Sequence, residues 1–464
     1  METYKGWFYR PGEDDKKIAG HLTINDDSTV QLDLLGGFYE GMSFIRSREY
    51  FTIWGDLFNG KKVTLFDSFK SNSNTVYGKS HTELYKIHLT LIGTHINARD
   101  TLHFNEINAE IDEINDWIGF IGGDFEYETN KKTTYTYIQH DDIVFNISDT
   151  LSGVFFFRQL KDFKSDRELT FREKTLINIK SNEFASVSHL IHSIMILRKL
   201  LSYFIGRKTK IRSMSLRSNN EFTSFKLPKG QEQVIYETIE IYYNDNEQYI
   251  TEPNKRYDFF VKYQDIAGDF NNIVQRWFED VEESLRPITN ILLDSLHYKK
   301  SFDETEFLFV FQGVEAFHRR CLQNTTILKE HHKAYLKEKL KSMADKEFKS
   351  WLLQRLNYAY EPFARVRLES IFKNYKDILI PGIEKKQYSL WIKQMVDSRN
   401  FLTHFDPDSA DKKVDSTTLY HYTSLLKALL AILILKHIGL NDEILALIPK
   451  TYSYSLDKLI NEIK

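Results

Sequence analysis

The chain contains WIKQMVDSRNFLTH at residues 391–404, and this segment predicts a helix that carries polar groups near its end. Apolar side chains over 392–402 recur at the three- and four-residue spacing of a buried helical stripe. Arg399 and Asn400 interrupt that stripe, and His404 follows. The pattern is typical of a helix in a bundle that presents an arginine, an amide and an imidazole at one point of its length.

The relative directions of these three side chains depend on where the helix ends. At about 100° per residue, Asn400 and His404 lie close on one face. Arg399 and His404 are about 140° apart, unless the helix ends or bends between them. The Asp-Pro-Asp sequence at 406–408 predicts that the helix ends there.

Helical periodicity continues through the whole second half of the chain, after Pro253. We expect helices at 270–284, 306–321, 333–341, 348–356, 363–375, 390–402 and 419–438. The last of these is apolar enough to form a core and could also contribute to an interface, of which the core alone is the favoured interpretation.

The first half has the two-residue alternation of β-strands instead. We expect strands at 21–25, 30–34, 85–91, 107–111, 154–157, 176–180 and 234–243, with Asn, Asp and Gly between several of them. One segment, 187–204, has helical periodicity and should end near Gly206 and pack on the sheet. His189 and His192 lie one turn apart there, and we interpret them as helix-face residues rather than metal ligands.

The predicted fold class is therefore α+β, with a β-rich domain at residues 1–252 that includes at least one packed helix, and an α-helical bundle at residues 253–464.

Composition narrows the class of protein. The net charge is −3, so an RNA site must be a local patch rather than a global basic field. The single cysteine, Cys321, excludes an intrachain disulfide and a cysteine-rich zinc site.

We expect no cofactor and no metal, because no glycine-rich phosphate loop and no HExxH motif occur. No secretory leader is apparent and the apolar run at 428–435 is short, so we expect a cytoplasmic protein without a membrane partner.

The trio of Arg399, Asn400 and His404 suits RNA cleavage without a metal. Histidine titrates near neutrality and can act as base or acid. Arginine is always charged and grips phosphate oxygens with a fork of N–H groups. Asparagine can donate to phosphate or fix the histidine tautomer. One such set lacks a second proton-transfer group, which a two-fold partner could supply with its own His404.

A structural interpretation is equally open at this point, since an Arg and a His at such a spacing should occur about twice by chance. Arg399 could pair with an acidic neighbour such as Asp397 or Glu315. His404 could serve as a favourable charge at the helix C-terminus.

The segment SRNFLTHF at 398–405, within a helical bundle, resembles the signature of the HEPN superfamily. A longer similarity is more specific. GWFYRP at 6–11, IAGHLTI at 18–24 and YKIHL at 85–89 resemble the N-terminal domain of ApeA-type anti-phage proteins, and FQGVEAFHR at 311–319 resembles the earlier core helix of their HEPN domain.

This resemblance implies an endoribonuclease of anti-phage defence by abortive infection. It implies that Arg399, Asn400 and His404 are catalytic, that 2′-hydroxyl attack leaves a 2′,3′-cyclic phosphate, and that the site is shared across a HEPN dimer. The partners implied are RNA, with tRNA as a family-level expectation, a second copy in a homodimer or higher even oligomer, and a phage-derived trigger at the N-terminal domain.

Further residues are candidates for supporting roles. Glu315 and His318 lie one turn apart on a predicted buried helix and could hold Arg399, although structural roles are favoured. Basic residues that could hold phosphates include Arg207 to Arg212 and, in the helical half, Lys333, Lys337, Lys341, Arg365 and Arg367. For the lysines a solvated helix face is the simpler interpretation, because glutamates intersperse them.

A different class of function is also open. The chain could be a non-catalytic HEPN module for dimerisation or docking, with an N-terminal domain that binds a phage protein.

Overall fold

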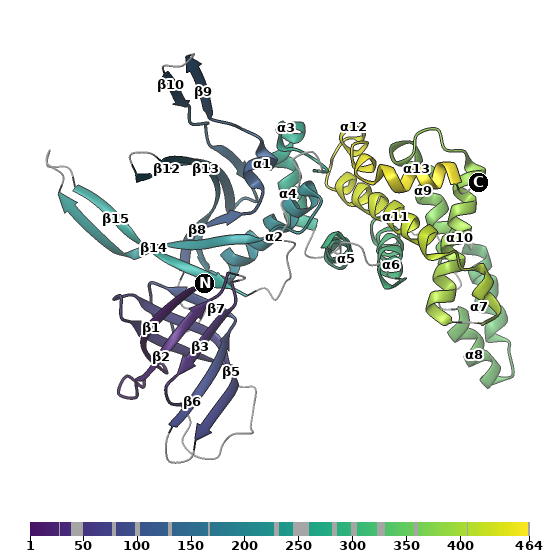
Figure 1. Ribbon diagram of the computed structural model, residues 1–464. Helices are drawn as coiled ribbons and strands as arrows, with labels where there is room; N and C mark the ends of the chain where they lie inside the picture. The colour runs from purple at the N-terminus through teal and green to yellow at the C-terminus, as the bar shows by residue number, and fades with distance from the viewer. Residues whose placement is uncertain are drawn as a thin grey trace. The chain divides into compact units, whose positions relative to one another are not determined.

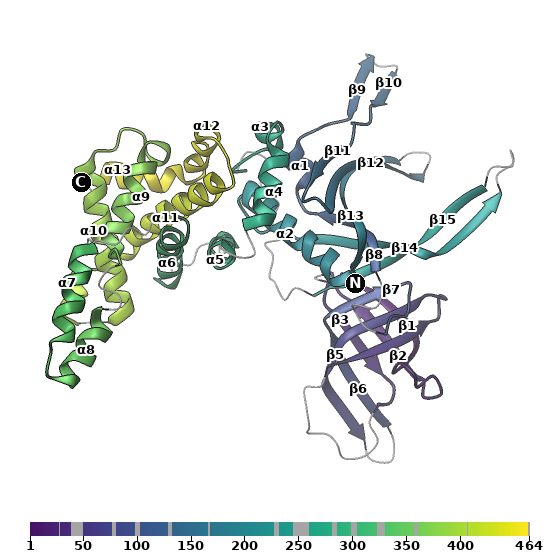
Figure 2. The ribbon, with the colours of Figure 1, turned by 180° about the vertical axis from the view of Figure 1, so that it is seen from behind.

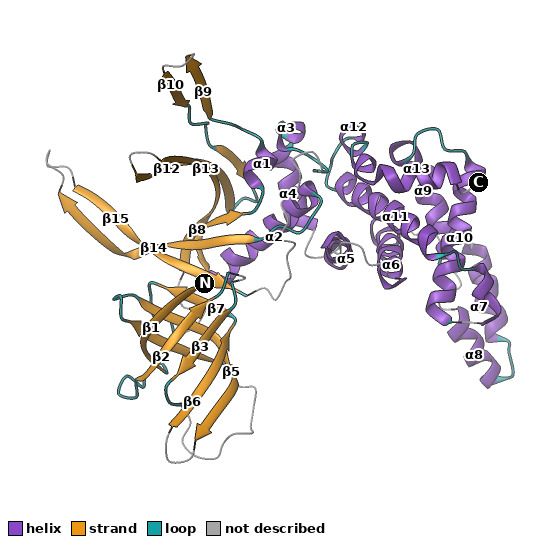
Figure 3. Ribbon diagram, in the orientation of Figure 1, coloured by secondary structure: helices purple, strands orange, loops and turns teal. Residues whose placement is uncertain are grey.

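The computed structural model describes residues 1–26, 28–38, 50–76, 80–97, 103–128, 132–165, 168–226, 232–244, 259–280, 285–297, 304–322, 330–356, 361–405 and 407–462. The chain forms two compact units (Figure 1). The first comprises Met1–Leu201 and Thr209–Pro253, and the second comprises Ser202–Lys208 and Asn254–Lys464. Strands make up most of the first unit and helices the second (Figure 3), so the expected α+β class is confirmed.

Part of the first unit is a closed antiparallel barrel. Its strands are β1 (Glu2–Tyr9), β2 (Ile18–Ile24), β3 (Val30–Leu34), β4 (Phe51–Leu57), β5 (Lys62–Val76) and β6 (Ser80–Ile87). They pair in the order β5-β4-β1-β2-β3-β6, and pairing of β5 with β6 closes the ring. Alternate residues point inward, and the interior is filled by buried side chains such as Phe8, Leu22, Leu32, Ile53 and Tyr85.

The same sheet continues beyond the barrel through the order β11-β12-β13-β8-β14-β15-β7-β5. These strands are β7 (Leu89–Ile92), β8 (His103–Ile111), β11 (Ile143–Asn146), β12 (Leu151–Ser165), β13 (Glu168–Ser186), β14 (Ile211–Lys226) and β15 (Glu232–Tyr243). A short helix, α1 (Ile114–Ile118), and a separate hairpin of β9 (Gly123–Glu128) and β10 (Lys132–Tyr137) lie between β8 and β11 in the chain.

The strand expected at 85–91 is two strands, and that expectation was wrong. β6 ends at Ile87 and β7 begins at Leu89, with a bend at His88. β6 pairs with β3 and β5 inside the barrel, whereas β7 pairs with β5 and β15. The bend therefore carries the chain from the barrel to the rest of the sheet, which apolar alternation alone does not reveal.

The helix expected in the first half is confirmed as α2 (Val187–Ile205). Gly206 follows it with φ 77°, and the N–H groups of Gly206 and Arg207 both donate to the Ser202 carbonyl. Glycine suits this left-handed position because it has no Cβ. The last turn, from Ser202, belongs to the second unit, where the Tyr203 hydroxyl donates to the Thr289 carbonyl.

The helices of the second unit are seen from two sides in Figures 1 and 2. They are α3 (Tyr263–Ile266), α4 (Phe270–Asp280), α5 (Arg286–His297), α6 (Glu304–Cys321), α7 (Glu330–Lys341), α8 (Lys346–Leu356), α9 (Ala364–Leu379), α10 (Lys385–His404), η2 (Pro407–Lys412), α11 (Ser416–His437), α12 (Asp442–Leu445), η3 (Ile448–Tyr452) and α13 (Ser453–Glu462). Each of the seven expected helices has a counterpart here, although residues 281–284 of the first lie outside the described residues.

Helix α11 forms the centre of this unit. Its residues are buried almost all round, and it packs against α5, α6, α9 and α13. It is long and apolar enough to cross a membrane by length and composition, but 83% of its most apolar window is buried within the fold. This burial is that of a core helix, which confirms the core role expected for 419–438.

Candidate active site

Helix α10 carries Arg399 and Asn400 in its last turns and ends at His404. Phe405 terminates the helix in the left-handed region, with φ 51° and ψ 34°, and its N–H donates to the Phe401 carbonyl at 2.6 Å. The helix is continuous to His404, so Arg399 and His404 leave its axis about 140° apart. Asn400 and His404 lie on the same face.

The guanidinium of Arg399 is held on two sides. Its Nη2 donates to Glu315 Oε2 on α6 at 3.3 Å, and its Nη1 donates to Asn400 Oδ1 at 3.1 Å. The ring of Phe311 lies beneath it, 5.9 Å from Cζ. The Arg399 side chain is still 32% exposed, so a phosphate oxygen could reach it from solvent.

Helix α6 supplies these contacts because its spacing places Phe311 and Glu315 one turn apart on the side that faces α10. The pairing expected between Arg399 and Glu315 in the structural interpretation is therefore present. An ion pair that leaves the guanidinium accessible also suits a group that must be oriented before it meets a phosphate.

His404 is exposed. Within the described part of the chain its ring makes no hydrogen bond or ion pair with another side chain. It sits among the last carbonyl groups of α10, where a positive charge is favoured. The imidazole is therefore available to a ligand or to a second protein chain.

The segment after α10 folds back along the helix end. Ser398 is fully buried, and its Oγ accepts a hydrogen bond from the Val414 N–H at 3.2 Å. Lys413 lies over the Phe401 ring, with Nζ 5.8 Å from the centroid. The serine in the motif thus fixes the backbone beside the site, a role that its position in the sequence did not indicate.

A second polar cluster lies on the other side of Glu315. His318 and Arg367 are only 4% and 2% exposed, and Arg367 Nη1 approaches His318 Nδ1 at 3.3 Å. Arg367 also donates to the Pro362 carbonyl at 2.9 Å and to Glu361 Oε2 at 3.0 Å. Burial, reinforced by the Arg367 charge, lowers the pKa of His318 and so favours the neutral form of its ring.

The residues proposed to contact RNA separate into two groups. Lys337 and Lys341 are exposed on α7, and Arg365 is exposed on α9, where it pairs with Glu369 at 3.0 Å. The side chain of Lys333 lies outside what the structure describes. Arg367 is enclosed by its protein partners, so we assign it to joining α6 and α9 rather than to RNA. Of the other basic cluster, Lys208 pairs with Asp294 at 3.6 Å, and Arg212 pairs with Asp112.

Comparison with known proteins gives two family matches. The family model described as ApeA N-terminal domain 1 matches residues 3–277. The model described as Apea-like HEPN matches residues 308–444, a range that includes Glu315, Arg399, Asn400 and His404. No curated protein and no solved structure matches the chain significantly.

Proposed function

This chain belongs to the family of ApeA-type HEPN proteins, and from that membership we propose that it is an anti-phage endoribonuclease that acts without a metal ion. The observation that carries the proposal is the end of α10, where an oriented but accessible guanidinium lies five residues from an exposed imidazole that bonds to no other side chain among the described residues.

The proposed reaction is an internal phosphoryl transfer in RNA. The 2′-oxygen forms a bond to the adjacent phosphorus and the bond to the 5′-oxygen breaks. One group takes the proton of the 2′-hydroxyl and another gives a proton to the departing 5′-oxygen, so the products are a 2′,3′-cyclic phosphate and a 5′-hydroxyl. His404 is suited to either proton transfer, and Arg399 to the charge that develops on the phosphorane.

Two features support a site shared between two copies of the chain. A single His404 cannot act as base and acid in the same step. Moreover, Arg399 and His404 leave the helix about 140° apart, so one copy does not aim both at one phosphate by helix geometry alone. A two-fold partner that brings its own α10 end would supply the second imidazole. Asn400 would orient the phosphate together with Arg399, to which it is already bonded.

The experiment compares purified wild type with the Arg399→Ala and His404→Ala variants on total RNA in the presence of EDTA. We expect the wild type to leave 2′,3′-cyclic phosphate ends, and each variant to cleave about a hundredfold more slowly or worse. Both side chains are at least partly exposed, so the thermal midpoint should be unchanged. Lys393→Ala, an exposed substitution on the same helix, is the matched control.

Full cleavage by either site variant would remove this assignment. Absence of cleavage by the wild type, with the fold intact, would favour the docking module instead. Expression in cells provides a second readout, because toxicity should disappear with the same two substitutions and persist with Lys393→Ala.

A further inference from the structure

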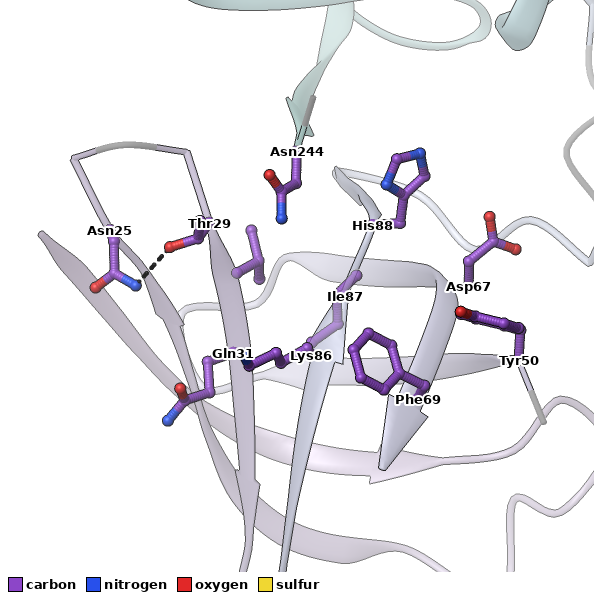
Figure 4. Close-up of a pocket in the computed structure, with 11 residues that line it drawn as sticks. Asn25, Thr29, Gln31, Tyr50, Asp67, Phe69, Lys86, Ile87, His88 and Asn244 are labelled. Atoms are coloured by element: carbon purple, nitrogen blue, oxygen red, sulfur yellow. Dashed lines mark hydrogen bonds between the residues drawn. The ribbon is translucent and has the colours of Figure 1, made fainter. Parts of the chain in front are cut away.

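A cavity of about 790 Å³ opens in the first unit, at the end of the barrel where β3 begins and β6 ends (Figure 4). Its size falls in the range of about 300–1,000 Å³ that is usual for small-molecule sites. It is lined by Asn25, Thr29, Val30, Gln31, Tyr50, Asp67, Phe69, Lys86, Ile87, His88 and Asn244. The proposed ribonuclease function makes no use of it.

The cavity arises where two neighbouring strands are irregular at the same level. β5 changes direction at Asp67, which adopts φ 49° although it is not glycine. β6 gives way to β7 at His88, and the registers Phe66↔Leu89 and Phe69↔Lys86 place the two irregularities beside each other. A backbone outlier of this kind costs about 1–3 kcal/mol and clusters at functional sites.

The upper rim is fixed by backbone hydrogen bonds. The Asn244 N–H donates to the His88 carbonyl at 3.0 Å, and the Asn25 N–H donates to the Thr29 carbonyl at 3.0 Å. The Asn25 side chain also donates to Thr29 Oγ1 at 2.9 Å (Figure 4). The cavity is therefore held open by the fold rather than formed on binding, which lowers the cost of ordering a ligand.

Three of the side chains that line the cavity lie on neighbouring strands and differ in chemistry. One is an amide, one is an ammonium group and one is an aromatic ring. Gln31 on β3 is opposite Lys86 on β6, and Lys86 is opposite Phe69 on β5. Tyr50 packs on Phe69 edge to face, with the ring centroids 5.7 Å apart, and is 61% exposed. Lys86 is exposed, and within the described part of the chain it forms no ion pair.

An extended peptide is a poor match for this surface. Peptides that dock on sheets usually add a strand through free backbone groups at an edge. At the cavity, β3 is paired with β2 and β6, and β6 is paired with β3 and β5, so neither presents a free edge. Recognition here must come from side chains.

Flat aromatic faces, amides and a lysine are what a nucleotide requires. Bases stack on Tyr and Phe, amide groups can both donate to and accept from a base edge, and an ammonium group attracts phosphate. We propose that this cavity is a binding site for the base of a single-stranded RNA, stacked on the exposed ring of Tyr50, with Lys86 at the backbone phosphate. The site is independent of cleavage, so its existence does not rest on the proposed function.

The test measures binding in the full chain that carries His404→Ala, so that RNA stays intact. A fluorescein-labelled uridine 12-mer is titrated and its anisotropy is followed. Tyr50→Ala and Lys86→Gln should each weaken binding, the former by about tenfold or more. Phe58→Ala is the matched control, because Phe58 is 64% exposed on the same barrel and packs edge to face on Trp7 outside the cavity.

A second arm uses a 12-mer that contains 5-iodouridine, with cross-linked peptides mapped by mass spectrometry. Cross-links at Tyr50, Phe69 or His88 that disappear in Tyr50→Ala would support the site. Equal binding by Tyr50→Ala and Phe58→Ala, without cross-links at the cavity, would overturn it. The proposal would also be overturned if uridine monophosphate competes as well as the 12-mer does, because the ligand would then be a free nucleotide rather than RNA.

Neither arm reads cleavage. If RNA does not bind at the cavity, the cleavage test at Arg399 and His404 is unaffected. If the cleavage test fails, the binding measurements still decide whether the cavity holds RNA.

Discussion

Glu315 is the residue on which the orientation of Arg399 depends. Its carboxylate holds one guanidinium nitrogen at 3.3 Å, while the Arg399 side chain as a whole stays 32% exposed. We expect Glu315→Ala to slow RNA cleavage about 10- to 100-fold, because a catalytic group displaced by about 1 Å can lose that much rate. Because the ion pair is partly exposed, its contribution to the free energy of unfolding should be about 0–1 kcal/mol.

Single-turnover cleavage and urea denaturation of the same preparation check this expectation. Glu304→Ala is the control, since Glu304 is on the same helix and pairs with Lys413 instead. Equal cleavage by the two variants would show that Arg399 needs no carboxylate to be positioned.

His318 should make the stability of the helical unit depend on pH. Its folded-state pKa is lowered below the unfolded value of about 6.5 by burial and by Arg367. Below pH 6.5 the unfolded chain binds more protons than the folded one, so the contribution of His318 is present above that pH and is lost as the pH falls.

The His318→Gln variant retains an acceptor for Arg367 but cannot titrate. Its free energy of unfolding should fall less than that of the wild type between pH 7.5 and pH 5, as measured by urea denaturation at each pH. If the free energy of unfolding of the two proteins changes equally with pH, His318 is protonated to the same extent in the folded and the unfolded state.

At the residue scale, the sequence predicts an Arg-Asn-His set and offers Asp397 or Glu315 as a partner for Arg399, and the structure shows Glu315 in that place. The sequence could not exclude Arg367 from RNA contact, because an arginine between exposed helix positions looks the same whether it points outward or inward. Only the approach of α6 and Glu361 shows that Arg367 is buried. The role of Ser398 in anchoring the following segment was hidden for the same reason.

Among the elements, α10 ends in a conformation that its sequence does not favour. Phe405 lies in the left-handed region, where a Cβ costs about 1–2 kcal/mol and glycine costs little. The side chain is 67% exposed, so little burial would be lost on its removal. We expect Phe405→Gly to raise the free energy of unfolding by about 1 kcal/mol.

Urea denaturation measures this change, and Phe401→Ala reports the contact between the two rings, whose centroids are 5.9 Å apart. A lower stability of Phe405→Gly would show that this contact outweighs the backbone strain at the helix end.

Helices and strands whose apolar residues recur at a regular spacing could be predicted from the sequence, and those without such a spacing could not. The apolar spacing of α2, α6 and α11 marked them, although their observed ends differ from the expected ones by up to three residues. The second half of β5 is rich in Ser and Asn and reads as a loop, yet it pairs with β6 along its length. That pairing supplies the backbone hydrogen bonds that propensity lacks, so tertiary context decides the strand.

At the scale of the whole molecule, a site shared by two chains has a quantitative consequence. If each site needs His404 from both copies, a dimer with one His404→Ala chain is inactive. Equal mixing of wild type with His404→Ala, followed by subunit exchange, should then lower activity per wild-type chain to about half.

Lys393→Ala chains mixed in the same way serve as the control and should leave total activity equal to that of wild type alone. If added His404→Ala leaves the activity per wild-type chain unchanged, a single copy of the chain carries out the complete reaction.

In the sequence, the change from two-residue to helical periodicity near Pro253 predicts a two-part organisation. Closure of the barrel could not be predicted, because it depends on one pairing between β5 and β6 and on a bend at His88 that apolar patterns do not mark. The boundary is also not a single point in the chain, since Ser202–Lys208 lies within the helical unit.

This interleaving limits how such genes can recombine. A crossover after residue 253 that imports a foreign C-terminal half would leave Ser202–Lys208 with the wrong neighbours, so that Tyr203 would meet a different residue in place of Thr289 and Lys208 one in place of Asp294. The helical unit is therefore not a contiguous cassette. Chimaeras should be tolerated best when the exchanged C-terminal half comes from a relative that preserves the surroundings of this short segment.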